Sequence, residues 1–111
     1  MTPILKVNCH EDGKVLRVVC VGAINSYSCM DLKSQLNEDT WDDFETVLLD
    51  LDGVEYVDSA GLAAFMVFHR EAKRGGCRLR IINYNSLVEE VAQRLGLFER
   101  LEMDRADRRL H

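Results

Sequence analysis

The apolar positions of this chain fall into short β-branched runs, and amphipathic stretches lie between them. Such runs are typical of buried strands. The runs at 4–9 and 15–21 are separated by a turn that contains Gly13, and they predict a hairpin. The run at 47–52 is apolar on nearly both faces, as expected of a central strand that is covered on two sides. Further strands are predicted at 78–82 and 101–103.

Three amphipathic stretches predict helices. The first begins at Ser26 or Ser28 and ends near residue 37, and its inner side is expected to carry residues 30–32 and Leu36. The second covers residues 60–73, with a stripe of spacings three and four formed by Leu62, Phe65, Met66, His69 and Ala72. The third opens on a capping-box pattern at 86–89, in which Ser86 is the predicted N-cap.

The connecting segments complete the predicted order. Gly22 is expected to end the second strand, and residues 53–57 to link the third strand to the second helix. The acidic residues 38–43 indicate a loop by composition, in which Trp41 covers the edge of the core. The order is therefore β-β-α-β-α-β-α-β. Single helices between strands imply parallel neighbours and right-handed crossovers, so the predicted fold class is α/β, with one mixed β-sheet packed against helices.

Composition narrows the class of function. The 111 residues predict one domain spanning 1–111, with 104–111 as a frayed tail. The net charge of −5 argues against a nucleic-acid partner, which normally meets a basic face. No apolar run approaches the length of a membrane span, and the N-terminus lacks a signal-peptide layout, so we expect a cytoplasmic protein without a membrane partner.

Metal and cofactor chemistry find little support in the sequence. The four cysteines are scattered without ligand spacing, which predicts free thiols: Cys9, Cys20, Cys29 and Cys77. Cys9 stands beside His10, but a zinc site needs three or four ligands. We therefore expect neither a metal site nor a cofactor.

The most informative stretch is 47–62, in which a buried strand leads to Asp58-Ser59-Ala60-Gly61-Leu62 at the opening of a helix. Ser59 should lie outward at the carboxyl end of a strand, the edge at which ligands dock in open α/β folds. Asn25, Ser26 and Tyr27 follow the second strand and should lie on the same edge. Ser59 could be an N-cap, a phosphate acceptor or both, since a hydroxyl suits each role.

In this context the chain resembles the STAS family of anti-sigma factor antagonists. The matching residues are Leu49-Asp50-Leu51, Val54 and Val57-Asp58-Ser59-Ala60-Gly61-Leu62. The resemblance implies a single STAS-like domain with Ser59 as its phosphorylation site. It also implies two partners, an anti-sigma factor that is a serine/threonine protein kinase and a metal-dependent serine phosphatase. The unmodified protein would bind the kinase and free the sigma factor.

The residues expected to contact the partner are Asn25, Ser26, Tyr27, Asp58, Ser59, Ala60, Gly61 and Leu62. Gly61 is expected to let a partner's backbone approach closely. The chain departs from the family at Asn25, where members often carry Asp. It also departs after the last strand, where a further helix is usual and only about eight residues remain, most of them charged.

Other functions stay open at this stage. The same fold serves as a non-catalytic subunit of lipid-transport ABC systems and as a part of stress-signalling assemblies, and the sequence leaves a homodimer open. An enzyme would need Ser59 as nucleophile and His69 as base. These residues stand ten positions apart on one predicted helix, about 15 Å along its axis, so we expect a protein that is not an enzyme.

Overall fold

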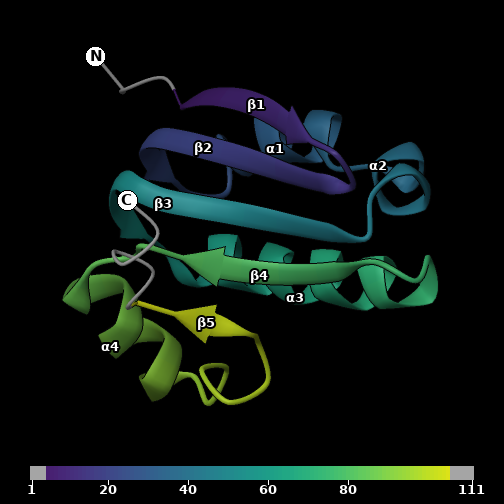
Figure 1. The fold of residues 1–111 in the computed structure, drawn as a ribbon. Helices are drawn as coiled ribbons and strands as arrows, with labels where there is room; N and C mark the ends of the chain where they lie inside the picture. The colour runs from purple at the N-terminus through teal and green to yellow at the C-terminus, as the bar shows by residue number, and fades with distance from the viewer. Residues whose placement is uncertain (1–4, 106–111) are drawn as a thin grey trace.

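The computed structural model describes residues 5–105. Its elements are β1 (Lys6–Asp12), β2 (Val15–Ile24), α1 (Cys29–Gln35), α2 (Glu38–Asp43), β3 (Thr46–Val57), α3 (Ser59–Arg74), β4 (Arg78–Ile82), α4 (Ser86–Arg94) and β5 (Met103–Asp104). They form a five-stranded sheet in the order β1-β2-β3-β4-β5 (Figure 1). β1 pairs with β2 in antiparallel fashion and every other pair is parallel. The α/β class with one mixed sheet is confirmed.

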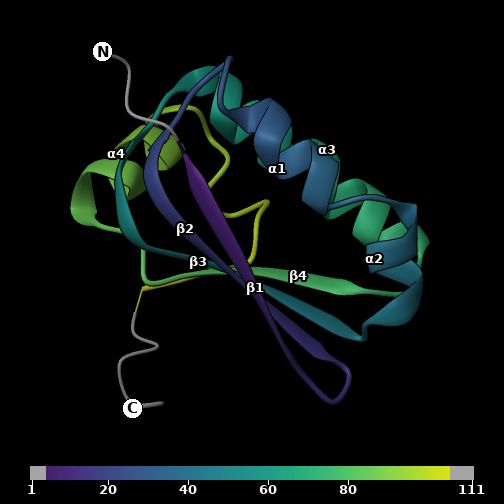
Figure 2. The ribbon, with the colours of Figure 1, turned by 90° about the horizontal axis from the view of Figure 1, so that it is seen from above.

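The core lies between the sheet and the helices. Figure 2 shows α1, α2 and α3 together on one face of the sheet. Alternate residues of β2 and β3, such as Val18 and Leu49, face this layer and are fully buried. Leu62, Phe65 and Ala72 of the predicted stripe are buried as expected, and Phe68 joins them. Met66 and His69 of that stripe are only half-buried, because the buried face of α3 turns toward Phe68 instead.

Two strands run further than predicted because glycines lie inside them. Gly22 has a φ of 124° and marks a register shift between β2 and β3, so β2 continues to Ile24 instead of ending there. Gly53 lies against β2, where a Cβ atom would be only 2.8 Å from Cγ2 of Val21. The predicted link 53–57 is therefore part of β3. A glycine that lets two backbones approach closely weakens a strand pattern without ending the strand.

The acidic segment predicted as a loop is the helix α2. Asn37 caps it by accepting a hydrogen bond from Asp39 N at 3.0 Å, and the Asn37 N–H donates to Thr40 Oγ1 at 3.3 Å. This reciprocal pair is a capping box. Glu38 and Asp39 occupy the first turn, where negative charge is favourable, so the acidic composition suits a helix start. Trp41 covers the core as predicted.

Other boundaries shift by a few residues. α1 is shorter than predicted, and Met30 on it is 61% exposed and does not face inward. The N-cap of α4 is Asn85, whose Oδ1 accepts from Val88 N at 2.9 Å, and Ser86 is the first helical residue. Asp104 belongs to β5, whereas most of the predicted tail, residues 106–111, lies outside the described residues. Any helix after the last strand would lie there too.

Between residues 5 and 105, none of the helices is long and apolar enough to cross a membrane.

Candidate functional site

α3 begins at the carboxyl end of β3, and Asp58 caps it. The Asp58 side chain accepts a hydrogen bond from Gly61 N at 2.8 Å, and its backbone N–H donates to Ile24 O at 3.1 Å. The carboxylate therefore satisfies a first-turn N–H that would otherwise lack an acceptor. The sequence left open whether Ser59 is the N-cap. The structure assigns that role to Asp58 and makes Ser59 the first helical residue.

Ser59 therefore does not serve as the cap of α3. Its side chain is exposed, and its hydroxyl makes no hydrogen bond within residues 5–105. The backbone N–H groups of Ser59 and Ala60 likewise have no acceptor in that part of the chain. A free hydroxyl thus lies at the positive end of a 16-residue helix, beside N–H groups that can donate hydrogen bonds to an anion.

The end of β2 lies beside this helix start. Ile24 pairs with Val57 in the parallel register, which places Asn25 next to Asp58 at one edge of the sheet. Asn25 Oδ1 accepts from Tyr27 N and from Ser28 N, both at 2.9 Å. Ser28 Oγ accepts from Asn25 N at 2.9 Å and donates to Ala23 O at 2.7 Å. These bonds fix the turn, so the predicted juxtaposition of Asn25–Tyr27 with Ser59 is present.

The departure at Asn25 changes charge more than shape. Both bonds use the side-chain oxygen as an acceptor, and an aspartate oxygen in the same place would accept them equally well. The amide therefore keeps the turn and removes one negative charge from the surface beside Asp58.

Gly61 and Leu62 are not surface residues. Both are buried, and a Cβ atom on Gly61 would lie 2.8 Å from Val57 Cγ1 and 2.9 Å from Ile24 Cγ2. Gly61 therefore lets α3 approach the ends of β2 and β3, and it does not make room for a partner's backbone as expected from the sequence. Leu62 anchors the same turn in the core. The accessible part of the predicted contact set is Asn25, Ser26, Tyr27, Asp58, Ser59 and Ala60.

Exposed apolar side chains accompany this edge. Tyr27 is 86% exposed, and Tyr56, three residues before Ser59, is 45% exposed. Met30 follows on the first turn of α1. Tyr56 lies in the segment that was predicted as a link and was not among the predicted contact residues, and Met30 was predicted to lie on the inner side of the first helix. The helical period was a usable signal for Met30, since residues two apart, such as Met30 and the buried Leu32, cannot share a helix face.

Asp50, at the centre of the Leu-Asp-Leu motif, is buried and holds three strands together. Its Oδ2 accepts from Arg17 Nε at 3.0 Å and also from Arg17 Nη2. Its Oδ1 accepts from Asp52 N at 3.0 Å and from Asn83 Nδ2 at 3.2 Å. Burial alone would raise the pKa of Asp50, but these hydrogen bonds and the Arg17 charge outweigh burial and lower it. The carboxylate thus stays ionised and joins β2, β3 and the end of β4.

The structure does not bring together Ser59 and His69, the nucleophile and base considered for an enzyme. Ser59 opens α3 and His69 lies in its third turn, about 15 Å away along the helix axis. His69 Nδ1 is buried without a hydrogen-bond partner in the described residues. No group of three or more metal-binding side chains occurs within residues 5–105.

Comparisons with known proteins bear on the family and the fold of this chain. The STAS domain model matches residues 6–107. An anti-sigma factor antagonist from Mycobacterium paratuberculosis superposes with a TM-score of 0.82 at 15% identity, covering 99% of this chain and 96% of that one. The anti-sigma factor antagonist SpoIIAA in its unphosphorylated form gives 0.76 at 15% identity, over 95% and 92%. The Bacillus protein SpoIIAA in its phosphorylated form gives 0.68 at 14% identity, over 95% and 96%. This chain belongs to the STAS domain family.

Proposed function

We propose that this protein is an anti-sigma factor antagonist of the cytoplasm, which binds an anti-sigma factor with serine/threonine kinase activity and releases it when Ser59 is phosphorylated. The observation that carries the proposal is the free, exposed hydroxyl of Ser59 at a helix start whose cap is supplied by Asp58. The likeness to SpoIIAA, a protein solved in both unphosphorylated and phosphorylated forms, supports it. The proposed role is binding, and Ser59 is the substrate of another protein's chemistry.

A phosphate on Ser59 would act on the partner more than on the fold. It adds roughly 1.5 to 2 negative charges, and the N–H groups of Ser59 and Ala60 can donate hydrogen bonds to its oxygens. The domain itself should therefore tolerate the modification. A partner docked on this edge meets the new charge beside the Asp58 carboxylate, and losing about 3 kcal/mol of coupling lowers affinity about a hundredfold.

The exposed side chains around Ser59 suit a docking surface. Aromatic residues and Met are enriched in protein interfaces, and Tyr27, Met30 and Tyr56 are all exposed here. The hydroxyl of Ser59 lies at the same end of the sheet, so a single partner could cover both. The apolar residues would supply affinity and the serine would supply the switch.

Phosphate mapping tests the acceptor. The protein is incubated with ATP and its kinase, which is captured from extract of the source organism on the unmodified protein. We expect one phosphate, located on Ser59 by mass spectrometry and absent in Ser59→Ala. Ser86→Ala is the matched control, because Ser86 is also the exposed first residue of a helix capped by an Asx side chain. It should be phosphorylated like the wild type, and a metal-dependent serine phosphatase should remove the group. Incorporation that persists in Ser59→Ala would overturn the assignment.

A further inference from the structure

β1 is an open edge of the sheet. It pairs with β2 on one side, and Figure 1 shows no element of the described chain beyond it on the other side. Six of its seven residues are exposed, and only Val7 is half-buried. The strand at the opposite edge, β5, is two residues long. β1 therefore presents the longer row of main-chain N–H and C=O groups that no strand of this chain pairs.

β1 lacks most of the features that protect a sheet edge. Protected edges are very short, carry proline, or are interrupted by a bulge. β1 contains neither proline nor glycine, and its register with β2 is unbroken from Lys6 to Asp12. Its charged side chains lie at its two ends, with Lys6 at the start and Glu11 and Asp12 at the finish. The edge is therefore open to a further strand.

The order of these charges favours a second copy of β1. Neither Lys6 nor Asp12 forms an ion pair within residues 5–105. If two copies of β1 run antiparallel, the positive start of each strand meets the negative end of the other. If they run parallel, like charges lie side by side. The strand is thus complementary to itself in the antiparallel direction alone.

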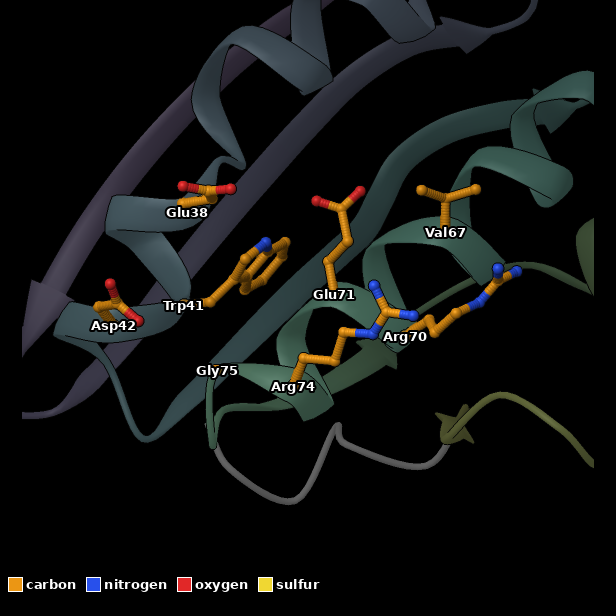
Figure 3. A pocket seen from close by; sticks show the side chains of 8 residues that line it. All are labelled: Glu38, Trp41, Asp42, Val67, Arg70, Glu71, Arg74 and Gly75. Carbon is orange, nitrogen blue, oxygen red and sulfur yellow. The ribbon is translucent and has the colours of Figure 1, made fainter.

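The cleft between α2 and α3 has no comparable order of charges. It has a volume of about 470 Å³, and its charged lining residues are Glu38, Asp42, Glu71, Arg70 and Arg74 (Figure 3). Carboxylates and guanidinium groups are mixed there, so the cleft selects no single class of ligand. On β1 the charges are instead separated along one direction, and this separation selects a partner strand of the same sequence.

Symmetry fixes the register of such a pair. Two identical antiparallel strands in one sheet are related by a two-fold axis perpendicular to the sheet, so each residue lies opposite one that faces the same side. Of the registers that meet this condition, the one centred on Cys9 pairs all seven residues. It places Lys6 opposite Asp12 twice, and it places no like charges opposite each other. Registers centred on other residues leave an end of each strand unpaired.

We propose that this protein forms a dimer in which β1 pairs with β1 of a second copy in antiparallel fashion, centred on Cys9. The two five-stranded sheets then become one continuous sheet. An interface made by one strand from each copy is small, so the dimer should be weak and should depend on protein concentration. The dimer does not require Ser59 or its phosphorylation, so the two proposals stand or fall separately.

Thiol cross-linking tests the register. Opposite residues of antiparallel strands have Cα atoms about 4.5 to 5.5 Å apart, which a disulfide can span. Cys29→Ser leaves Cys9 as the exposed cysteine, since Cys20 and Cys77 are buried. When this variant is oxidised with copper phenanthroline, we expect a covalent dimer joined through Cys9, identified by mass spectrometry of the unreduced peptides. A sample that stays uncross-linked would contradict the proposal.

The matched control is Cys29→Ser/Cys9→Ser/His10→Cys, which moves the thiol to the next exposed position of β1. In the proposed register the two new thiols are two residues out of line, and their Cα atoms are about 8 Å apart, beyond the reach of a disulfide. The control should cross-link at least about tenfold more slowly. If it cross-links as fast as Cys9, random collision forms the bond and the proposed register is wrong.

Charge reversal tests the pairing without an oxidant. Lys6→Glu places like charges opposite each other at both ends of the interface and should weaken dimerisation about tenfold in sedimentation velocity. Lys6→Glu/Asp12→Lys restores opposite charges and should restore the dimer. The two positions lie about 20 Å apart on one strand, so this rescue cannot arise within one copy. The proposal is overturned if the wild type stays monomeric at every concentration, if Lys6→Glu dimerises like the wild type, or if the double variant is not rescued.

Discussion

Gly61→Ala tests whether this glycine serves the fold or a partner. The added Cβ would lie 2.8 Å from Val57 Cγ1, 2.9 Å from Ile24 Cγ2 and 3.2 Å from Ile24 O. Atoms cannot remain so close, so the first turn of α3 must move away from β2 and β3. Overpacking of this kind costs about 1 to 3 kcal/mol. Replacing glycine by alanine in a helix returns up to about 1 kcal/mol. We expect a net loss of about 1 to 2 kcal/mol in the free energy of unfolding.

The assay is urea unfolding followed by the fluorescence of Trp41 and by circular dichroism. Gly61→Val should lose more than Gly61→Ala, because a larger side chain meets the same atoms. Ala63→Gly, at an exposed position of α3, measures the helix-propensity term separately and should cost about 1 kcal/mol. The packing explanation is refuted if Gly61→Ala is as stable as the wild type or more stable and loses only its binding to the partner.

Three further predictions concern stability. Asp58→Ala should lower the free energy of unfolding by about 1 kcal/mol through loss of the cap, whereas Ser59→Ala should change it by less than about 0.5 kcal/mol in the same urea titrations; the reverse order would restore Ser59 as the structural residue. Because the pKa of Asp50 is lowered in the folded state, its ionised carboxylate stabilises the fold above about pH 4, and this stabilisation is lost as pH falls below that value. In thermal melts recorded against pH, the melting temperature of Asp50→Asn should therefore fall less steeply toward acid pH than that of the wild type. An unchanged fall would contradict the role of the hydrogen bonds to Asp50. On α1, Leu32→Ala should cost about 2 to 5 kcal/mol and Met30→Ser less than about 0.5 kcal/mol, and similar losses in denaturant unfolding would contradict the assigned helix face.

Most elements were predictable from the sequence because each has a clear hydrophobic period; α2, which was predicted as a loop, is the exception. The parallel pairing of strands joined through helices was also predicted and is present. Helix caps were harder to predict. At Asn85-Ser86 the prediction chose serine as the cap, and at Asp58-Ser59 it left serine open as the cap. In both cases the preceding Asx residue accepts the first-turn hydrogen bond. Aspartate, asparagine and serine cap helices about equally well, so propensity alone does not choose between neighbours. At Asp58 the backbone register selects the cap, since Asp58 N still donates to Ile24 O of the neighbouring strand and the helix begins after it.

The contact surface was the harder part to predict. The sequence brought the turn at Asn25 to the same sheet edge as Ser59, because both follow strands that proved to be parallel neighbours. Which residues of the motif are buried could not be predicted from strand order in the same way. Gly61 and Leu62 stand in the motif beside Ser59, yet the helical period turns them inward. The acidic residues 38–43 were predicted as a loop from their composition, whereas the capping box at Asn37 starts a helix there.

The account depends on the charge at one exposed serine. Its most direct test is the affinity of the kinase partner for the unmodified protein and for the same protein carrying phosphate on Ser59, measured by calorimetry at one salt concentration, with circular dichroism to compare their folds. We predict two equally folded proteins and an affinity at least about a hundredfold weaker for the phosphorylated one. Equal affinities, or a weakened affinity accompanied by an unfolded domain, would contradict the proposed switch.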